Sequence, residues 1–336
     1  MTCLLWPGTR WLDDNAVERE VLGGRAAGVF VPDVNDVTTD QWRRCDGMMA
    51  RADPLAVIRP KDVPDCKIIV TPKVGYDNFD LGVWGNAGVP VCNVPDYGTE
   101  DVADHALGLL LALVRGVGRY EQALRADPVV GWKPTEQPLA KRLRGAQMGI
   151  VGLGRIGTAM ALRCKAFGMD VGFYDPYRDN GVDLALGVRR YASLAALFGA
   201  ADFVSLHLPL TAETRNLINA EVLATARPGL VLVNAARGEV LDLEALAGAL
   251  KNGSVGGAGL DVLPEEPLNP AEPLLAAWRR QEAWLEHRLL VTPHAGFYTP
   301  ESMRDMRSKG IEVALRYLAG GRLENCVNEA FLTSRR

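Results

Sequence analysis

The amino-acid sequence predicts an α/β protein with two domains, each built on a doubly wound parallel sheet. First, the chain has 336 residues, which exceeds the usual size of one domain. Second, short apolar runs alternate with helix-forming stretches, an order that is typical of parallel sheets. Third, a glycine-rich turn joins the apolar run at residues 148–151 to a helical stretch at residues 159–167. These observations favour two α/β units over a single larger core.

The N-terminal part predicts a small parallel sheet with a helix over residues 36–45, capped by Thr38, Thr39 or Asp40. Expected strands lie at residues 26–31, 48–50, 66–70 and 89–94. The loop 71–80 follows a strand, where open α/β sheets bind ligands. Gly75 in this loop can turn backbone N–H groups toward an anion, although a structural turn fits the pattern as well.

A long helix is predicted from Glu100 to Arg115, with Thr99 as its cap. His105 lies on this helix, and we expect it to pack or to face solvent rather than to catalyse. Residues 126–145 contain three prolines and are expected to be irregular. Later strands are expected at 148–151, 169–174, 203–208, 230–233, 257–262 and 289–292, with helices at 194–198, 220–225, 242–250 and 300–318.

Gly152, Gly154 and Gly157 follow the strand at 148–151 in G-x-G-x-x-G spacing. The first glycine permits a tight turn, the second lets a pyrophosphate approach the backbone, and the third lets helix and strand pack closely. Asp175 ends the next apolar run, about 20 residues further on, where a carboxylate binds ribose hydroxyls and repels a 2′-phosphate. The pattern therefore favours NAD over NADP, although Arg178 is nearby. The alternative is a plain turn followed by an exposed acid.

Composition narrows the class of protein. The chain is 48% hydrophobic and 23% charged, with a net charge of −4 and no basic run, so nucleic-acid binding is not expected. Six cysteines occur singly without a C-x-x-C pair, which predicts neither a metal site nor a disulfide framework. No apolar run is long enough for a membrane span, and the acidic first 25 residues do not resemble a secretory signal. A cytoplasmic location is expected.

Three residues that follow predicted strands can carry chemistry. Arg237 presents a planar fork of donors that suits a carboxylate. His294 can exchange a proton near neutral pH, and Glu266 can tune and orient it. Singly, they could be a surface ion pair, a structural histidine and a solvated acid. Together with a nicotinamide cofactor, they are the groups that hydride transfer to a carbonyl requires.

The chain resembles the D-isomer-specific 2-hydroxyacid dehydrogenase family across roughly residues 66 to 328. The motifs are Gly75–Asp80, Gly152–Gly157, Leu206–Thr211, Val233–Gly238, Gly259–Val262, Glu266–Pro267 and Thr292–His294. Within the family, residues 91–95, 165–168, 173–177 and 325–328 are most similar to the C-terminal-binding-protein branch. The resemblance implies a flavodoxin-like substrate domain, formed by residues 1–96 and 297–336, and a Rossmann NAD-binding domain, residues 97–296. It also implies a homodimer formed through the NAD-binding domain.

The resemblance further implies roles for single residues. Arg237 would hold the substrate carboxylate and carbonyl oxygen, His294 would protonate the carbonyl oxygen, and Glu266 would pair with His294. The backbone of Val74 and Gly75 would bind the carboxylate. The residues implied to line NAD are Thr99, Gly152, Gly154, Arg155, Ile156, Gly157, Asp175, His207, Pro209, Thr214, Ala235 and Asp261.

The sequence also departs from its relatives. Phe297 stands where the C-terminal-binding proteins have tryptophan, so the pocket is aromatic but differently shaped. Val74 replaces the lysine of phosphite dehydrogenases, which argues against phosphite. The segment 268–288 is longer than in the C-terminal-binding-protein branch, and it forms either an extra helix or part of the surface. Arg51 is a candidate contact for the distal end of the substrate.

Two functions fit these observations. The first is an NAD-dependent enzyme that interconverts a 2-keto acid and a D-2-hydroxy acid. The second is a dimeric protein that senses NAD(H) and recruits a partner, as in the C-terminal-binding-protein branch. The set Arg237, Glu266 and His294 favours the enzyme, because a sensor does not need a proton donor.

Overall fold

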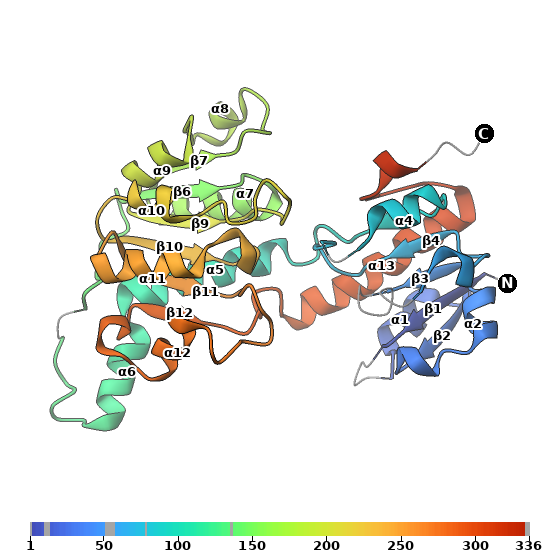
Figure 1. Ribbon diagram of the computed structural model, residues 1–336, viewed down its shortest axis with the longest axis horizontal. Helices are drawn as coiled ribbons and strands as arrows, with labels where there is room; N and C mark the ends of the chain where they lie inside the picture. The colour runs from blue at the N-terminus through green and yellow to red at the C-terminus, as the bar shows by residue number, and fades with distance from the viewer. Residues whose placement is uncertain (1, 10–13, 51–57, 78, 135–136, 333–336) are drawn as a thin grey trace. The chain divides into compact units, whose positions relative to one another are not determined.

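The computed structural model describes residues 2–9, 14–50, 58–77, 79–134 and 137–332 (Figure 1). The chain divides into two compact units. Unit 1 consists of Met1–Gly98 with Tyr298–Arg336, and unit 2 consists of Thr99–Phe297. Phe297 therefore lies in unit 2.

Unit 1 has a five-stranded parallel sheet of order β2-β1-β3-β4-β5, which is the flavodoxin-like order. Its strands are β1 (Cys3–Pro7), β2 (Ala27–Val31), β3 (Gly47–Met49), β4 (Ile68–Val70) and β5 (Val91–Cys92). Its helices are α1 (Ala16–Leu22), α2 (Thr39–Arg44), α4 (Leu81–Asn86) and α13 (Pro300–Gly320), with 3-10 turns η1 (Val34–Asp36), η2 (Pro60–Asp62) and η5 (Glu329–Phe331).

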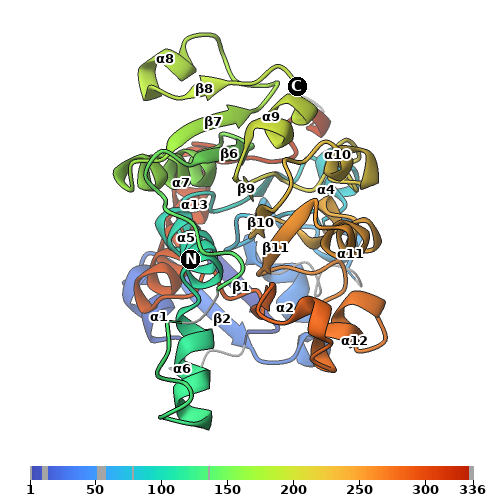
Figure 2. The same ribbon diagram turned by 90° about the vertical axis from the view of Figure 1, so that its left-hand side faces the viewer.

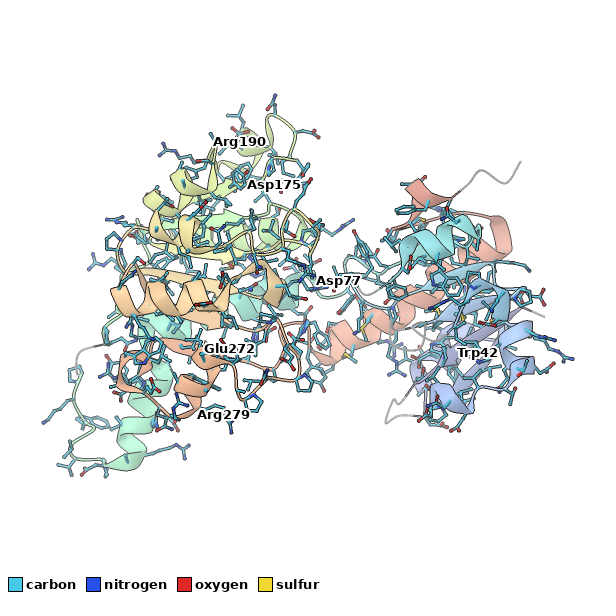
Figure 3. All side chains as sticks on the ribbon, in the orientation of Figure 1. Trp42, Asp77, Asp175, Arg190, Glu272 and Arg279 are labelled. Atoms are coloured by element: carbon cyan, nitrogen blue, oxygen red, sulfur yellow. The ribbon has the colours of Figure 1, made fainter. Side chains whose placement is uncertain are left out.

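The two faces of this sheet have separate cores, because successive strand residues point to opposite sides. Leu5 and Trp42 belong to the core under α2 and α4, and Figure 3 labels Trp42. Leu4 packs on the other face, with Ile311 of α13 and Leu22 of α1. Helices α1 and α13 thus cover one face, and α2 and α4 the other (Figure 1).

A buried ion pair joins helices α1 and α13. The Arg307 Nε donates to Glu18 Oε1 at 2.7 Å, and its Nη2 donates to Glu18 Oε2. Both residues are buried, so each charge depends on the other for compensation. The pair fixes α1 on α13.

Unit 2 has a seven-stranded parallel sheet of order β12-β11-β10-β9-β6-β7-β8. The strand order reverses between β6 and β9, so that β7 and β8 extend the sheet on one side and β10 to β12 on the other (Figure 2). Its strands are β6 (Gln147–Val151), β7 (Asp170–Tyr174), β8 (Arg189–Arg190), β9 (Phe203–Leu206), β10 (Leu230–Asn234), β11 (Val255–Leu260) and β12 (Leu289–Val291). This is the Rossmann arrangement, in which ligands bind at the carboxyl ends of the strands near the reversal.

Helices cover both faces of the larger sheet. The helices are α5 (Thr99–Arg115), α6 (Val117–Ala126), α7 (Arg155–Ala166), α8 (Val182–Leu186), α9 (Leu194–Ala200), α10 (Ala220–Ala224), α11 (Leu243–Asn252) and α12 (Pro273–Arg279), with 3-10 turns η3 (Gly238–Val240) and η4 (Ala283–Leu285). On one face, Leu110 of α5 and Met160 of α7 pack on Ile150. On the other face, helices α9 to α12 form a second core, which includes Leu246 and Leu232.

The predicted fold class, two doubly wound parallel sheets, is confirmed. Thr38 caps α2, since its side chain accepts from the Gln41 N–H at 3.2 Å and the Gln41 side chain accepts from the Thr38 N–H. The prediction that Thr99 caps the long helix is wrong, because Thr99 is the first helical residue and its hydroxyl makes no capping bond. Strand β1 and helices α1 and α4 were not predicted. Residues 268–288 contain α12 and η4, whose apolar residues pack on the core of unit 2.

Candidate active site

The turn between β6 and α7 is shaped by its glycines. Gly152 has φ +88°, and a Cβ there would lie 2.4 Å from the His207 carbonyl oxygen. A Cβ on Gly157 would lie 2.0 Å from the Gly152 carbonyl oxygen, so only glycine lets the helix pack this closely on the strand. By contrast, a Cβ on Gly154 would meet nothing within 4 Å. The turn therefore leaves open space at the start of a 12-residue helix, where N–H groups favour an anion.

Asp175 follows β7 and borders the same turn (Figure 3). Its Oδ2 accepts from the Leu153 N–H at 2.8 Å, and its Oδ1 accepts from the Tyr177 N–H at 2.9 Å. These bonds fix the carboxylate beside the glycine turn.

Two enclosed polar atoms lie at the carboxyl end of the sheet without a hydrogen-bond partner among the described residues. They are the Thr99 Oγ1, at the start of α5, and the His207 Nδ1, just after β9. The other ring nitrogen of His207, Nε2, lies 2.9 Å from Ser205 Oγ. Enclosed polar atoms are normally paired, so these two fit contacts to a bound ligand. Together with the open glycine turn and Asp175, they fit the phosphate and ribose groups of a dinucleotide.

The enclosure of His207 lowers the pKa of its imidazole to about 4, because burial disfavours the charged ring. In the unfolded chain the ring titrates near 6.5. The unfolded state therefore binds more protons between these two values. The neutral ring of His207 therefore makes its full contribution to the free energy of unfolding above pH 6.5, and this contribution is lost as the pH falls to about 4.

We expect His207→Gln to flatten this part of the stability profile. Between pH 7 and pH 4.5, wild type should lose about 2 kcal/mol more unfolding free energy than the variant. This is less than the full pKa shift implies, because part of the residue is exposed. Urea unfolding at both pH values measures the difference. Equal losses in the two proteins would show that His207 is not the titrating group.

The other residues predicted to line NAD lie around the same end of the sheet. Arg155 and Ile156 begin α7, and Ala235 follows β10. Thr214 closes the loop after β9 by donating to the Pro209 carbonyl at 2.6 Å. Asp261 follows β11.

His294 and Glu266 form a hydrogen-bonded pair. The His294 Nδ1 lies 2.7 Å from the Glu266 Oε2. The Glu266 Oε1 accepts from the Leu263 N–H at 3.0 Å. Burial opposes ionisation of Glu266, but its hydrogen bonds to His294 and Leu263 outweigh burial, so the pKa of the carboxyl is lowered. A carboxylate on Nδ1 fixes the ring and leaves Nε2 as the nitrogen that can exchange a proton with a ligand.

Arg237 lies near this pair. It follows β10, and its positive charge also helps to lower the pKa of Glu266. The Arg237 Nη1 donates to the Ala236 carbonyl at 2.7 Å, and the Arg237 carbonyl accepts from Asn234 Nδ2 at 2.9 Å. The fold thus gathers Arg237, Glu266 and His294 from three segments. Phe297 is also close, with its ring edge-on to His294 at a centroid distance of 6.1 Å.

A network of hydrogen bonds holds the loop that carries His294. Asp261 accepts from the Ala295 N–H at 2.9 Å, the Gly296 N–H at 2.8 Å and the Thr292 hydroxyl at 2.6 Å. His105 joins this network, with its Nε2 3.0 Å from Thr292 Oγ1 and 3.2 Å from Asp261 Oδ1. His294 itself has φ +53°, a conformation that costs a non-glycine residue energy and needs such support.

Sequence reasoning missed this role of His105. Its position on a long helix indicated only packing or exposure, because the loop it contacts lies far along the chain. Asp261, which the resemblance assigned to NAD alone, also anchors the His294 loop. Burial opposes its ionisation, but these hydrogen bonds outweigh burial and hold the pKa of its carboxyl well below the usual range.

The substrate-binding residues predicted in unit 1 are described only in part. Val74 lies in the loop after β4, where its carbonyl accepts from Asn93 Nδ2 at 2.7 Å, and Gly75 follows it. Arg51 lies outside the described residues.

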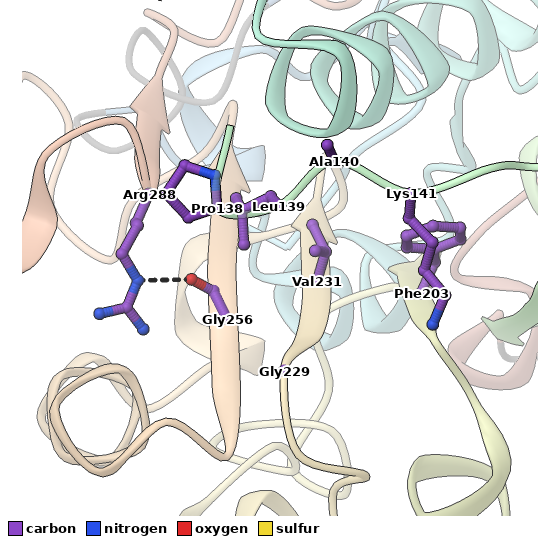
Figure 4. Close-up of a pocket in the computed structure, with 9 residues that line it drawn as sticks. All are labelled: Pro138, Leu139, Ala140, Lys141, Phe203, Gly229, Val231, Gly256 and Arg288. Atoms are coloured by element: carbon purple, nitrogen blue, oxygen red, sulfur yellow. Dashed lines mark hydrogen bonds between the residues drawn. The ribbon is translucent and has the colours of Figure 1, made fainter. Parts of the chain in front are cut away.

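A cavity of about 260 Å³ lies at the other end of the unit 2 sheet. Phe203, Gly229, Val231 and Gly256 line it from the amino ends of β9, β10 and β11, and the Arg288 Nε donates to the Gly256 carbonyl at 2.6 Å (Figure 4). Because the strands are parallel, this cavity is separate from the site at their carboxyl ends.

Two absences concern the residues that the structure describes. No group of three or more His, Cys, Asp or Glu side chains is arranged to hold a metal ion there. In the same part of the chain, no helix has the length and apolar character that a membrane crossing requires.

Known proteins show what this chain is similar to. Residues 107–296 match the family model of the D-isomer specific 2-hydroxyacid dehydrogenase NAD-binding domain. A glyoxylate reductase of Korarchaeum cryptofilum is 36% identical over 300 residues, which cover 89% of this chain and 87% of the relative.

Two solved structures extend the comparison. The NADPH-dependent glyoxylate/hydroxypyruvate reductase of Sinorhizobium meliloti, with NADP and malonate, superposes with a TM-score of 0.81 at 32% identity, covering 100% of this chain and 98% of its own. The D-lactate dehydrogenase of Aquifex aeolicus, with NAD and lactic acid, has a TM-score of 0.76 at 28% identity, covering 94% and 96%.

The fold and site define a nicotinamide-dinucleotide-dependent α/β oxidoreductase. The chain belongs to the D-isomer specific 2-hydroxyacid dehydrogenase family, and its similarity to the reductases above supports oxidoreduction between 2-keto and 2-hydroxy acids.

Proposed function

We propose that the protein reduces a small 2-keto acid to the D-2-hydroxy acid with NADH, and catalyses the reverse oxidation. The observation that carries this proposal is the 2.7 Å hydrogen bond between His294 Nδ1 and Glu266 Oε2, beside the guanidinium of Arg237. A protein that only senses dinucleotides does not need a histidine held by a carboxylate beside a guanidinium.

Each residue has a distinct role in the proposal. The Arg237 guanidinium holds the substrate carboxylate and carbonyl oxygen, and the backbone N–H groups of Val74 and Gly75 add donors for the carboxylate. His294, as imidazolium, gives its Nε2 proton to the carbonyl oxygen as negative charge develops there. Glu266 stabilises the imidazolium and keeps Nδ1 protonated. The reduced nicotinamide, when bound, supplies the hydride.

The proposed substrate is a short acid such as glyoxylate or hydroxypyruvate. The relatives named glyoxylate reductase support this choice. Phe297, whose ring is edge-on to that of His294, is proposed to line the substrate pocket. Arg51 is proposed to contact the distal end of the substrate.

Turnover of a panel of keto acids tests the function. The panel comprises glyoxylate, hydroxypyruvate, pyruvate, phenylpyruvate, 4-methylthio-2-oxobutyrate and phosphonopyruvate, each with NADH and NADPH. We expect one of the short acids to have the highest kcat/KM. NADH binding without turnover of any acid would overturn the proposal. That outcome would favour the NAD(H)-sensing function and the C-terminal-binding-protein branch, which at present rest on sequence resemblance alone.

We propose NAD as the preferred dinucleotide, with Asp175 as the residue that selects it. We expect Asp175→Ser to lower the ratio of kcat/KM for NADH over NADPH by about 10²-fold, since the variant loses both the ribose contact and the repulsion of a 2′-phosphate. Asp179→Ser is the control, because Asp179 is an exposed acid beyond the turn after β7. An unchanged ratio in Asp175→Ser would contradict this assignment.

We also infer a homodimer formed through unit 2. Val129, Val130 and Trp132 follow α6 with 81%, 62% and 78% of their surface exposed. Asp127 holds this turn, since its Oδ1 accepts from the Val129 and Val130 N–H groups at 2.8 Å. An ordered turn that presents three large apolar side chains is suited to a second copy of the chain.

We expect Trp132→Asp to shift the protein from dimer to monomer in sedimentation velocity. Leu184→Asp is the matched control, because Leu184 is 82% exposed on α8. A monomeric wild type, or a dimer in which Trp132→Asp has no effect, would contradict the inference.

The six free cysteines support a reducing compartment such as the cytoplasm.

A further inference from the structure

Two cysteines face each other where the C-terminal segment runs beside β5. The Val327 N–H donates to the Val91 carbonyl at 2.8 Å, and the Asn93 N–H donates to the Asn325 carbonyl at 3.1 Å. These bonds flank Cys92 and Cys326, which form an isolated antiparallel bridge. The two cysteines therefore occupy a non-hydrogen-bonded pair, in which the Cα atoms lie about 4.5 Å apart. This separation is within the range that a disulfide spans.

The two thiols differ in access and in acidity. Cys92 is fully buried, whereas Cys326 is partly exposed. A hydrogen bond from the Cys92 thiol lowers the pKa of Cys326 to about 7, and the same bond raises the pKa of Cys92. When neutral, the Cys326 thiol donates to Asn328 Oδ1 at 3.2 Å. Cys326 is therefore the reactive thiol of the pair, and Cys92 is the resolving thiol.

We propose that Cys92 and Cys326 are a site of reversible oxidation that closes to a disulfide on reaction with a peroxide. The Cys326 thiolate attacks one peroxide oxygen and becomes a sulfenic acid, while the O–O bond breaks and the other oxygen leaves as hydroxide, or as alkoxide from an organic peroxide. The Cys92 sulfur then attacks the sulfenic sulfur. The S–S bond forms, the S–O bond breaks, and the Cys92 proton leaves with the hydroxyl group as water. The two thiols lose two electrons in total, and the peroxide gains them.

The disulfide would link β5 covalently to the C-terminal segment, two stretches whose asparagines already form hydrogen bonds with neighbouring backbone. Asn328 is buried, accepts from the Val91 N–H at 2.8 Å and donates to the Val89 carbonyl at 3.1 Å. On the other strand, Asn93 follows Cys92 and its side chain holds the Val74 carbonyl. The cross-link therefore fixes the C-terminal segment and the backbone beneath the loop at residues 71–75.

Unit 1 provides a matched pair of thiols for comparison. Cys45 and Cys66 also neighbour each other, and the influence of Cys45 together with burial raises the pKa of Cys66. Both are buried, so neither offers an exposed thiolate to a peroxide. We expect this pair to stay reduced under conditions that oxidise Cys92 and Cys326.

The test treats the reduced full-length protein with one equivalent of hydrogen peroxide, alkylates the remaining thiols, and maps peptides by mass spectrometry without reduction. We expect a peptide that links Cys92 to Cys326, the loss of two thiols per chain, and a rise in Tm of roughly 5 °C that dithiothreitol reverses. Cys326→Ser should abolish the link and the rise, whereas Cys66→Ser should retain both.

Three outcomes would overturn the proposal. They are oxidation of Cys326 to sulfinic acid without a link, a link to another cysteine, and a link between two chains. Cys326→Ala serves as a second variant if Cys326→Ser does not fold. Because none of these measurements depends on turnover, the result is independent of the proposed enzymatic function.

Discussion

Replacing the proton donor is expected to have the largest effect on turnover. His294→Gln should lower kcat for 2-keto acid reduction by about 10²–10⁴-fold, because glutamine keeps a polar side chain but cannot transfer a proton near neutral pH. The Kd of NADH should change by less than about twofold, since the glycine turn, Asp175 and the enclosed atoms of Thr99 and His207 are unaffected. Single-turnover kinetics and NADH fluorescence titration measure the two quantities.

A second histidine provides the control for this experiment. His287 lies before β12, where its Nε2 is 3.3 Å from Glu286 Oε1, so His287→Gln removes a similar exchangeable group beside an acid. We expect that variant to retain wild-type kcat. Unchanged turnover in His294→Gln would show that the proton comes from elsewhere, even if the dinucleotide binds normally.

Gly154→Ala is expected to separate dinucleotide binding from folding. A Cβ on Gly154 meets no neighbouring atom within 4 Å in the protein, and its φ of −74° is open to any residue, so the fold should be unchanged. The new methyl would occupy the space where the backbone meets a pyrophosphate. Loss of charge-assisted hydrogen bonds worth about 2 kcal/mol corresponds to a rise of roughly 30-fold in the Kd of NADH.

Gly157→Ala, three residues on, provides the contrast. Its Cβ would lie 2.0 Å from the Gly152 carbonyl oxygen, so α7 must move away from β6. We expect a loss of about 3 kcal/mol or more in unfolding free energy, together with weaker NADH binding. Thermal unfolding and NADH titration of both variants test the pair. If Gly154→Ala bound NADH as tightly as wild type, the turn would not be the pyrophosphate site.

The fold was largely predictable because buried parallel strands are apolar along their whole length. The apolar run that ends at Val70 illustrates this, since the strand Ile68–Val70 is buried along its whole length. Strand β1 was missed because its five residues, Cys3–Pro7, stand beside no turn signal on their N-terminal side and end in proline. The α4 helix was missed because two glycines and one β-branched residue give Leu81–Asn86 a low helix propensity. Its stability comes from Trp84, which is buried in the core.

The site was less predictable than the fold. The glycines could be interpreted from spacing because backbone sterics impose that spacing locally. The pairing of His294 with Glu266 joins residues 28 positions apart, with α12 and β12 between them, so its geometry depends on the fold rather than on local sequence. The contact of His105 with Thr292 joins residues 187 positions apart. No local pattern encodes such a contact, because it depends on the packing of helix α5 against β12 in the folded protein.

The division of unit 1 between the two ends of the chain has a consequence for synthesis on the ribosome. The sheet residues Leu4 and Ile68 emerge early, but the helix α13 that covers them is made only after all of unit 2. Glu18 likewise precedes its buried partner Arg307 by 289 residues. For most of translation, therefore, α13 does not yet cover one face of this sheet, and the Glu18 carboxylate does not yet have the Arg307 guanidinium as its partner. Chaperones that bind nascent apolar segments would have their longest opportunity here, and unit 2 can complete its own core before unit 1 does.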